Sequence, residues 1–306
     1  MKIEEAVAKA LKTESHERIR KEIEKAEKIG VSLIPYGDEL YPKSLVEIHE
    51  PPPLLYVWGE RIDVLSRFSI AVVGSRKASS YGKAAASLIA GDLARNGVVI
   101  VSGLAYGIDS TAHAAAVKNG STIAVLGNGV DIVYPRSNAK LFEEVKKHGC
   151  LVSEFPFGSK PDKWTFPRRN RIIAGLSKGT VVIEAAKRSG SLITARLALE
   201  EGREVFAVPG PIFSLSSEGT NELIKEGAKC TTCVDDVIEE FEYVKLAQKS
   251  EQIDDPIIEC LKKGPKTTEE ISHSIGIPMN ELNVKLTMLE VNGDIECDSS
   301  GKFRLI

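Results

Sequence analysis

The sequence has no apolar run long enough to cross a membrane, and it is poor in cysteine and aromatic residues. Aromatic residues make up 6% of its 306 residues, and its five cysteines are odd in number. This usage excludes a secreted scaffold held together by disulfides and fits thiols kept reduced in a cytosol. The first residues, MKIEEAVAKALKTESHE, are charged and helix-prone, unlike a secretion signal. We therefore expect a cytoplasmic globular protein with no membrane-spanning segment.

Two familiar phosphate-binding motifs are also missing. No G-x-G-x-x-G follows an apolar run, and the Gly82-Lys83 pair is followed by Ala84, where a P-loop has Ser or Thr. Cys230 and Cys233 form a C-x-x-C pair, but no second pair accompanies them. A structural role for these thiols is favoured, and a metal or redox site is the alternative. We predict no cofactor and no metal.

The segment from Phe68 to Gly103 organises the rest of the chain. An apolar run at 70–73 ends in a glycine turn, an amphipathic stretch follows at 81–96, and a second apolar run occupies 98–101. This is the pattern of a βαβ unit with parallel strands. Because both runs are apolar throughout, we expect central strands covered by helices on both faces.

The same alternation continues to Phe241 and predicts an α/β fold with an open, doubly wound parallel sheet. Strands are expected at 70–73, 98–101, 122–126, 150–153, 180–183, 204–207 and 228–230. Helices are expected at 81–96, 109–119, 138–148, 168–177, 191–201, 219–226 and 234–241. The units do not close to eight, so a barrel is not favoured.

Smaller modules flank this sheet domain. Residues 1–53 predict a helical N-terminal domain and lead-in, and residues 54–59 an edge strand that opens the domain at 54–241. A polar linker is expected at 242–255. Residues 256–306 predict three helices and a hairpin, which is typical of a winged helix-turn-helix.

Charge is distributed unevenly along the chain. The net charge is −3, yet residues 160–205 hold ten Lys and Arg against five acidic residues. From Asp254 onward there are ten acidic and six basic residues. An anionic partner is therefore expected at the sheet domain. For the acidic winged helix a regulatory or protein-contact role is favoured, with DNA reading as the alternative.

Two stretches carry candidate binding residues. The turn Gly74-Ser75-Arg76-Lys77 follows a strand end, where parallel sheets bind anionic ligands. The segment 163–177 places Arg168, Arg169, Asn170 and Arg171 in the expected first turn of a helix, where cations oppose the helix dipole. A bound anion would compensate, and neighbouring aromatic rings fit single-stranded nucleic acid. The alternative is a salt-bridged helix start.

These motifs together resemble a known family. The strings VVGSR (72–76), SGLAYGID (102–109), FPRRNRIIAGLS (166–177), GSLITA (190–195) and VPG (208–210) look like those of the DNA-processing protein A family, DprA or Smf. The resemblance implies an extended Rossmann-like domain that binds single-stranded DNA without a catalytic step, helps load the RecA recombinase and forms a homodimer. Carried over by motif, the implied DNA-binding residues are Gly74, Ser75, Arg76, Ser102, Gly103, Phe166, Arg168, Arg169, Asn170, Arg171 and Ser191.

An enzyme remains as the alternative function. Residues 179–184, GTVVIE, resemble a segment of the nucleoside-monophosphate phosphoribohydrolases, in which the glutamate assists N-glycosidic cleavage. Here the spacing to Glu184 is one residue longer, and the preceding pair of glycines is absent. This alternative predicts a nucleotide-binding enzyme or sensor, whereas the favoured prediction is no enzyme.

Overall fold

The computed structural model describes residues 2–241, 256–262, 264–291, 295–298 and 301–305. They form two compact units, 1–241 and 242–306, and each is described by itself. The predicted linker at 242–255 lies outside the described residues, and the predicted domain boundary at 53/54 stays a prediction. Among the described helices, none is both long and apolar enough to span a bilayer.

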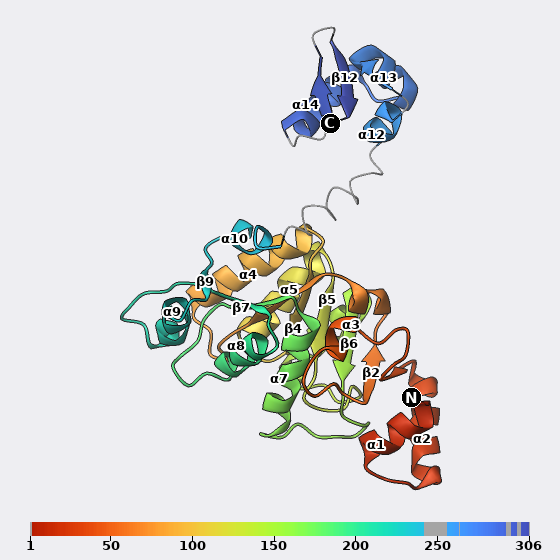
Figure 1. The fold of residues 1–306 in the computed structure, drawn as a ribbon, viewed down its shortest axis with the longest axis vertical. Helices are drawn as coiled ribbons and strands as arrows, with labels where there is room; N and C mark the ends of the chain where they lie inside the picture. The colour runs from red at the N-terminus through yellow and green to blue at the C-terminus, as the bar shows by residue number, and fades with distance from the viewer. Residues whose placement is uncertain (1, 242–255, 263, 292–294, 299–300, 306) are drawn as a thin grey trace. The chain divides into compact units, whose positions relative to one another are not determined.

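A nine-stranded sheet forms the centre of the first unit (Figure 1). Its order is β1-β2-β6-β5-β4-β3-β7-β8-β9, and the seven strands from β6 to β9 are parallel. The strands are β1 (Ser32–Pro35), β2 (Leu54–Trp58), β3 (Ser69–Val73), β4 (Val99–Ser102), β5 (Thr122–Val125), β6 (Gly149–Ser153), β7 (Gly179–Val182), β8 (Glu204–Ala207) and β9 (Lys229–Cys230). The predicted α/β fold class is confirmed.

Helices cover both faces of the sheet. The helices are α1 (Ile3–Leu11), α2 (His16–Ile29), α3 (Lys43–Val46), α4 (Ser80–Arg95), α5 (Ile108–Asn119), α6 (Ala139–His148), α7 (Thr165–Leu176), α8 (Gly190–Glu200), α9 (Glu218–Lys225) and α10 (Asp235–Ile238). Ile123 and Val125 of β5 belong to the hydrophobic core that includes residues of α7, while Ala124 between them belongs to the core that includes residues of α6. Alternate residues of one strand therefore enter two cores, which explains its continuous apolar sequence.

The N-terminal segment departs from the prediction of an all-helical lead-in. It contains the strand β1, which pairs antiparallel with β2 and forms the edge of the sheet. The strand expected at 54–59 is present as β2, but its expected edge position is wrong, because β2 lies between β1 and β6. Helices α1 and α2 lie beside β2 and share its hydrophobic core (Figure 1).

The chain reverses its direction across the sheet at β3. From β3 it adds β4, β5 and β6 on one side, and then crosses to place β7 on the other side of β3. The loops after β3 and β7 consequently diverge at the carboxyl ends of neighbouring strands. Open α/β sheets bind ligands at such a switch point.

The second unit has the predicted winged-helix elements. Helices α12 (Pro256–Leu261), α13 (Thr268–Ile275) and α14 (Met279–Val291) are accompanied by an antiparallel sheet of β10 (Lys266–Thr267), β12 (Lys302–Leu305) and β11 (Ile295–Cys297). Thr267 and Glu270 form a capping box at the start of α13. Leu282 and Leu286 of α14 are buried against Ile257 and Ile271, so the unit has its own core.

Candidate functional site

A cleft of about 720 Å³ lies at the switch point, and we call it the cleft. It is built by the turn after β3, the loop after β4, the first turns of α7 and the loop that leads into α8. Its lining includes residues 73–77, Ala105, Asp109, Tyr134, Lys163, Phe166, Pro167, Arg169, Asn170, Ile173, Ala186, 188–191, Ile193 and Thr194. The fold brings residues of both predicted binding stretches together here, although the stretches are about ninety residues apart in the sequence.

Positive charge dominates the cleft. Arg76, Lys77, Lys163 and Arg188 line it with exposed side chains, and none of the four forms an ion pair with a carboxylate among the described residues. Asp109 is the acidic residue in the lining. Four exposed, uncompensated cations around one opening favour a ligand with several negative charges.

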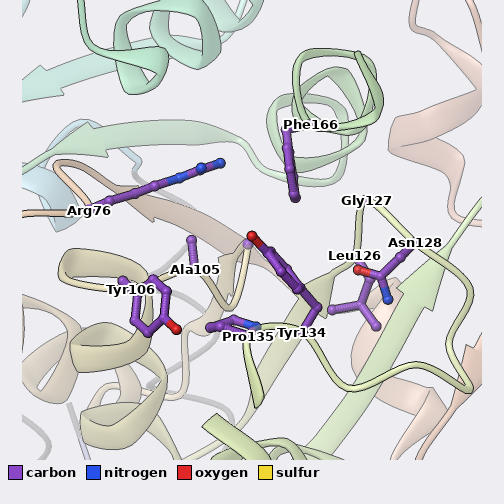
Figure 2. Close-up of a pocket in the computed structure, with 10 residues that line it drawn as sticks. Arg76, Ala105, Tyr106, Leu126, Gly127, Asn128, Tyr134, Pro135 and Phe166 are labelled. Atoms are coloured by element: carbon purple, nitrogen blue, oxygen red, sulfur yellow. The ribbon is translucent and has the colours of Figure 1, made fainter. Parts of the chain in front are cut away.

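Arg76 and Phe166 face each other across the cleft. The Arg76 guanidinium carbon lies 4.8 Å from the centre of the Phe166 ring, a cation–π distance. Phe166 also meets Tyr134, with ring centres 5.8 Å apart and planes at 31°. Figure 2 shows Arg76, Phe166 and Tyr134 around one opening. A flat nucleobase can stack on such rings.

The turn after β3 is held by Glu184. The Ser75 N–H donates to the Glu184 main-chain oxygen at 2.7 Å, and the Ser79 N–H donates to Glu184 Oε2 at 2.8 Å. A Cβ on Gly74 would lie 2.6 Å from Ile108 Cγ1, so only glycine fits where β3 leaves the sheet. The N-terminus of α4 therefore already holds an internal carboxylate, and anion binding falls to the side chains of the turn.

Arg169 is an internal support of the cleft. It is 4% exposed, and its Nη1 donates to the main-chain oxygens of Gly103, at 2.8 Å, and Val125. Burial lowers the pKa of its guanidinium to about 10, opposed by the nearby Asp109. Burial likewise raises the pKa of Asp109. Through its hydrogen bonds Arg169 ties the loop after β4 to the end of β5.

Arg168 and Arg171 both pair with the buried carboxylate of Glu154. Arg171 donates from Nη2 to Glu154 Oε2 at 2.6 Å, and Arg168 Nη2 forms an ion pair with the same oxygen at 3.0 Å. Glu154 is buried at the end of β6, so the alternative of a salt-bridged helix start holds for these two arginines. Neither arginine lines the cleft. Their direct contact with DNA stays a prediction.

The remaining predicted residues divide between the cleft and the interior. Asn170 lines the cleft and donates from Nδ2 to the Gly190 oxygen at 3.4 Å, and Ser191, next to Gly190, also lines the cleft. Ser102 is fully buried, with its hydroxyl donating to the Val72 oxygen at 2.6 Å. Gly103 lines a smaller pocket beside the cleft.

Sequence reasoning did not place several lining residues in the site, among them Lys163, Arg188, Tyr106 and Tyr134. Lys163 and Arg188 were counted among the clustered cations but not placed in the site. Tyr106 and Tyr134 lie in loops without periodicity, so no pattern marked them, yet they are 49% and 40% exposed beside Phe166. Tyr106 precedes Gly107 and Tyr134 precedes Pro135, and such dipeptides indicate turns. This was the signal that the sequence offered.

Comparison with known proteins agrees with this geometry. Residues 32–242 match the family model of DNA recombination-mediator protein A. The chain belongs to this DprA family. Protein Smf of Escherichia coli strain K12 is 43% identical to it over 289 residues, which cover 89% of this chain and 77% of that protein. The predicted family membership is confirmed.

Two solved DprA structures resemble this chain. The X-ray structure of DNA processing protein A from Streptococcus pneumoniae has a TM-score of 0.69 and 45% identity, covering 74% of this chain and 78% of that chain. A structure from Helicobacter pylori, which concerns the single-stranded DNA binding mode of its DNA processing protein A, has a TM-score of 0.63 and 32% identity. It covers 69% of this chain and 94% of that chain.

Proposed function

We propose that this DprA family protein binds single-stranded DNA in the cleft and acts in DNA processing without a catalytic step. The observation that carries the proposal is the contact of Arg76 with Phe166 in a cleft lined by four exposed cations, Arg76 among them, that form no ion pair within the described residues. Cations beside aromatic faces suit a strand whose phosphates and bases are both accessible. The single-stranded DNA binding of the Helicobacter pylori relative supports the same function.

The proposed contacts follow from the lining of the cleft. Gly74, Ser75 and Arg76 form one wall, and Phe166, Asn170 and Ser191 belong to the facing elements. Arg76, Lys77, Lys163 and Arg188 neutralise phosphates, and Phe166 stacks a base. Ser102, Gly103, Arg168, Arg169 and Arg171 hold the strand ends and α7 in place through the hydrogen bonds described above.

A gel-shift titration tests the proposed binding. Labelled single-stranded oligonucleotides of about fifteen nucleotides are compared with duplexes of the same length and sequence. Preferential binding of the single strand, with affinity that falls steeply as salt rises, is the expected result. Equal affinity for both forms would show that the aromatic faces play no part, because paired bases are not available for stacking.

We also propose that the protein helps load RecA onto single-stranded DNA during transformation and recombination, as a cytoplasmic homodimer. Family membership supports this part of the proposal. RecA assembly is followed on single strands coated with single-strand-binding protein, with and without this chain. Faster assembly in its presence is expected, and unchanged assembly at saturating protein would rule out the loading role.

The phosphoribohydrolase alternative is not favoured. Glu184 is 2% exposed, its Oε1 accepts from the Ser216 hydroxyl at 2.6 Å, and it does not line the cleft. Among the described residues it forms no ion pair with Arg168 or Arg171, which both pair with Glu154. A carboxylate fixed in the interior is poorly placed to assist cleavage in the cleft. Release of adenine from AMP that disappears in Glu184→Gln would restore the alternative.

A further inference from the structure

Beside Phe166 the cleft adjoins a smaller side pocket. Arg76, Ala105, Tyr134 and Phe166 line both spaces, so the two lie next to each other. Asn128 also lines the side pocket, next to Tyr134 (Figure 2). The free volume is about 20 Å³, which accepts one group the size of a water molecule. The side pocket can therefore receive the edge of a flat ligand but not a whole ring.

Asn128 presents a fixed hydrogen-bond acceptor to this pocket. It is 1% exposed, and its Nδ2 donates to the main-chain oxygens of Gly129, at 2.9 Å, and Ile132, at 2.7 Å. Rotating the amide by half a turn would set its oxygen against those two carbonyls, so Oδ1 is identified by its surroundings. Among the described residues no donor reaches Oδ1. Oδ1 is reachable by solvent, so a ligand that enters the pocket can supply the donor in place of water.

The main chain holds Asn128 in this position. Its own main-chain oxygen accepts from the Ser153 hydroxyl at 2.7 Å, which ties the loop to the end of β6. Gly127 lets Phe166 approach, because a Cβ there would lie 2.9 Å from Phe166 Cδ1. Acceptor and aromatic ring are thus set side by side before any ligand arrives.

Base edges differ in what they offer to such an acceptor. Cytosine and adenine carry an exocyclic amino group, N4 or N6, at the position where thymine and guanine carry a carbonyl oxygen, O4 or O6; the amino group of guanine, N2, is on a different edge of its ring. An amino group is close to a water molecule in size and donates to an amide oxygen. A carbonyl oxygen at the same place would face Oδ1 with no proton between them.

We propose that the side pocket takes the exocyclic amino group of a cytosine or adenine, whose ring stacks on Tyr134 or Phe166, with Asn128 Oδ1 as the acceptor. The inference rests on the proposed single-stranded DNA binding and adds a base preference to it. Asn128 is then a specificity-determining residue, while the cations of the cleft contact every sequence alike.

Modified oligonucleotides test this preference on the intact protein. Fluorescence anisotropy gives the affinity for labelled strands of about fifteen nucleotides that contain cytosine, thymine, or 2-pyrimidinone, which is cytosine without its amino group. We expect cytosine strands to bind roughly two- to tenfold more tightly than either of the others, the span of one net hydrogen bond. Equal affinity for cytosine and 2-pyrimidinone would overturn the proposal.

Two asparagine variants separate recognition from loop support. Asn128→Ala should bind cytosine and 2-pyrimidinone strands equally. Asn138→Ala is the matched control, because its Nδ2 also donates to a loop carbonyl, that of Leu104 at 3.0 Å, but the residue lines neither pocket. It should keep the cytosine preference, and loss of that preference in Asn138→Ala alone would contradict the proposal.

The wild-type comparison decides the matter even if Asn128→Ala fails to fold. The same measurements distinguish failure of the base preference from failure of the proposed single-stranded DNA binding. Tight binding of thymine strands with no cytosine preference leaves the proposed function intact and removes only the amino-group pocket. Absence of binding to every single strand removes both.

Discussion

The guanidinium carbon of Arg76 lies 4.8 Å from the ring centre of Phe166. Arg76 follows β3 and Phe166 belongs to the first turn of α7, so the contact joins the two predicted binding stretches. Either residue alone would be an ordinary turn or helix residue. Together they place a positive charge against a stacking surface, as a single nucleic-acid strand requires.

Replacement of Arg76 tests the cationic side of this contact. Arg76→Ala should weaken binding of single-stranded DNA by about tenfold and lower the slope of log affinity against log salt by about one, because one phosphate contact is lost. Fluorescence titration at several salt concentrations measures both. Arg20→Ala is the control, since Arg20 is exposed, pairs with Glu24 and lies outside the cleft. Equal losses in both variants would point to general charge rather than to the cleft.

Replacing Arg171 should destabilise the fold more than replacing Arg168. Arg171→Ala leaves the buried Glu154 with only Arg168 and should lower the free energy of unfolding by about 3 kcal/mol. Arg168→Ala should cost less than about 1 kcal/mol, because that side chain is 44% exposed. Urea denaturation measures both. An Arg171→Ala protein with unchanged stability and lost DNA binding would instead make Arg171 a DNA contact.

His113 should make the protein sensitive to acid. Burial lowers the pKa of this fully buried histidine from 6.5 to about 3, with a further contribution from Arg169. Between pH 6.5 and 3 the unfolded chain binds a proton that the folded chain does not. The free energy of unfolding should therefore fall with decreasing pH, by at most about 1.4 kcal/mol per pH unit from this group.

His113→Gln provides the comparison, because all other titrating groups are common to both proteins. Urea unfolding at pH 7, 6, 5 and 4 gives the pH dependence of the free energy of unfolding. The variant should lose less stability across this range than the wild-type protein. Parallel curves would show that His113 titrates alike in the folded and unfolded chains.

Removal of the winged helix should leave DNA binding largely intact. The first unit contains the whole cleft and has its own hydrophobic cores, while residues from Asp254 onward carry more acidic than basic groups. A chain ending at Phe241 should bind single-stranded DNA within about threefold of the full-length affinity. Titration of both proteins at equal salt measures the difference. A loss of tenfold or more would assign DNA contacts to the winged helix.

The sequence predicted the sheet well because its parallel strands are buried on both faces. Runs such as 70–73 and 98–101 are apolar throughout, and glycine turns mark their ends, so their positions follow from composition alone. The strand β1 was missed because its four residues, Ser32–Pro35, are too few to show an alternation of apolar and polar side chains. Nothing in those residues distinguishes an edge strand from a loop.

The site was predicted only in part, because charge pairing is a tertiary property. Arg168 and Arg171 look alike in sequence to Arg76, but Glu154 approaches them from the end of another strand and engages them both. Asn128 and Tyr134 belong to the loop after β5, where no periodicity ranks one residue above another. Their importance depends on the position of Phe166, which only the fold supplies.

Photochemical cross-linking tests the central claim most directly. A single strand containing 5-iododeoxyuridine is irradiated on the protein, and the cross-linked residues are located by mass spectrometry. Phe213 is an internal control, because it is 95% exposed but does not line the cleft. Cross-links at Phe166 or Tyr134, and none at Phe213, are the predicted result. Cross-links confined to Phe213 or to Phe303 of the winged helix would contradict the cleft as the DNA-binding site.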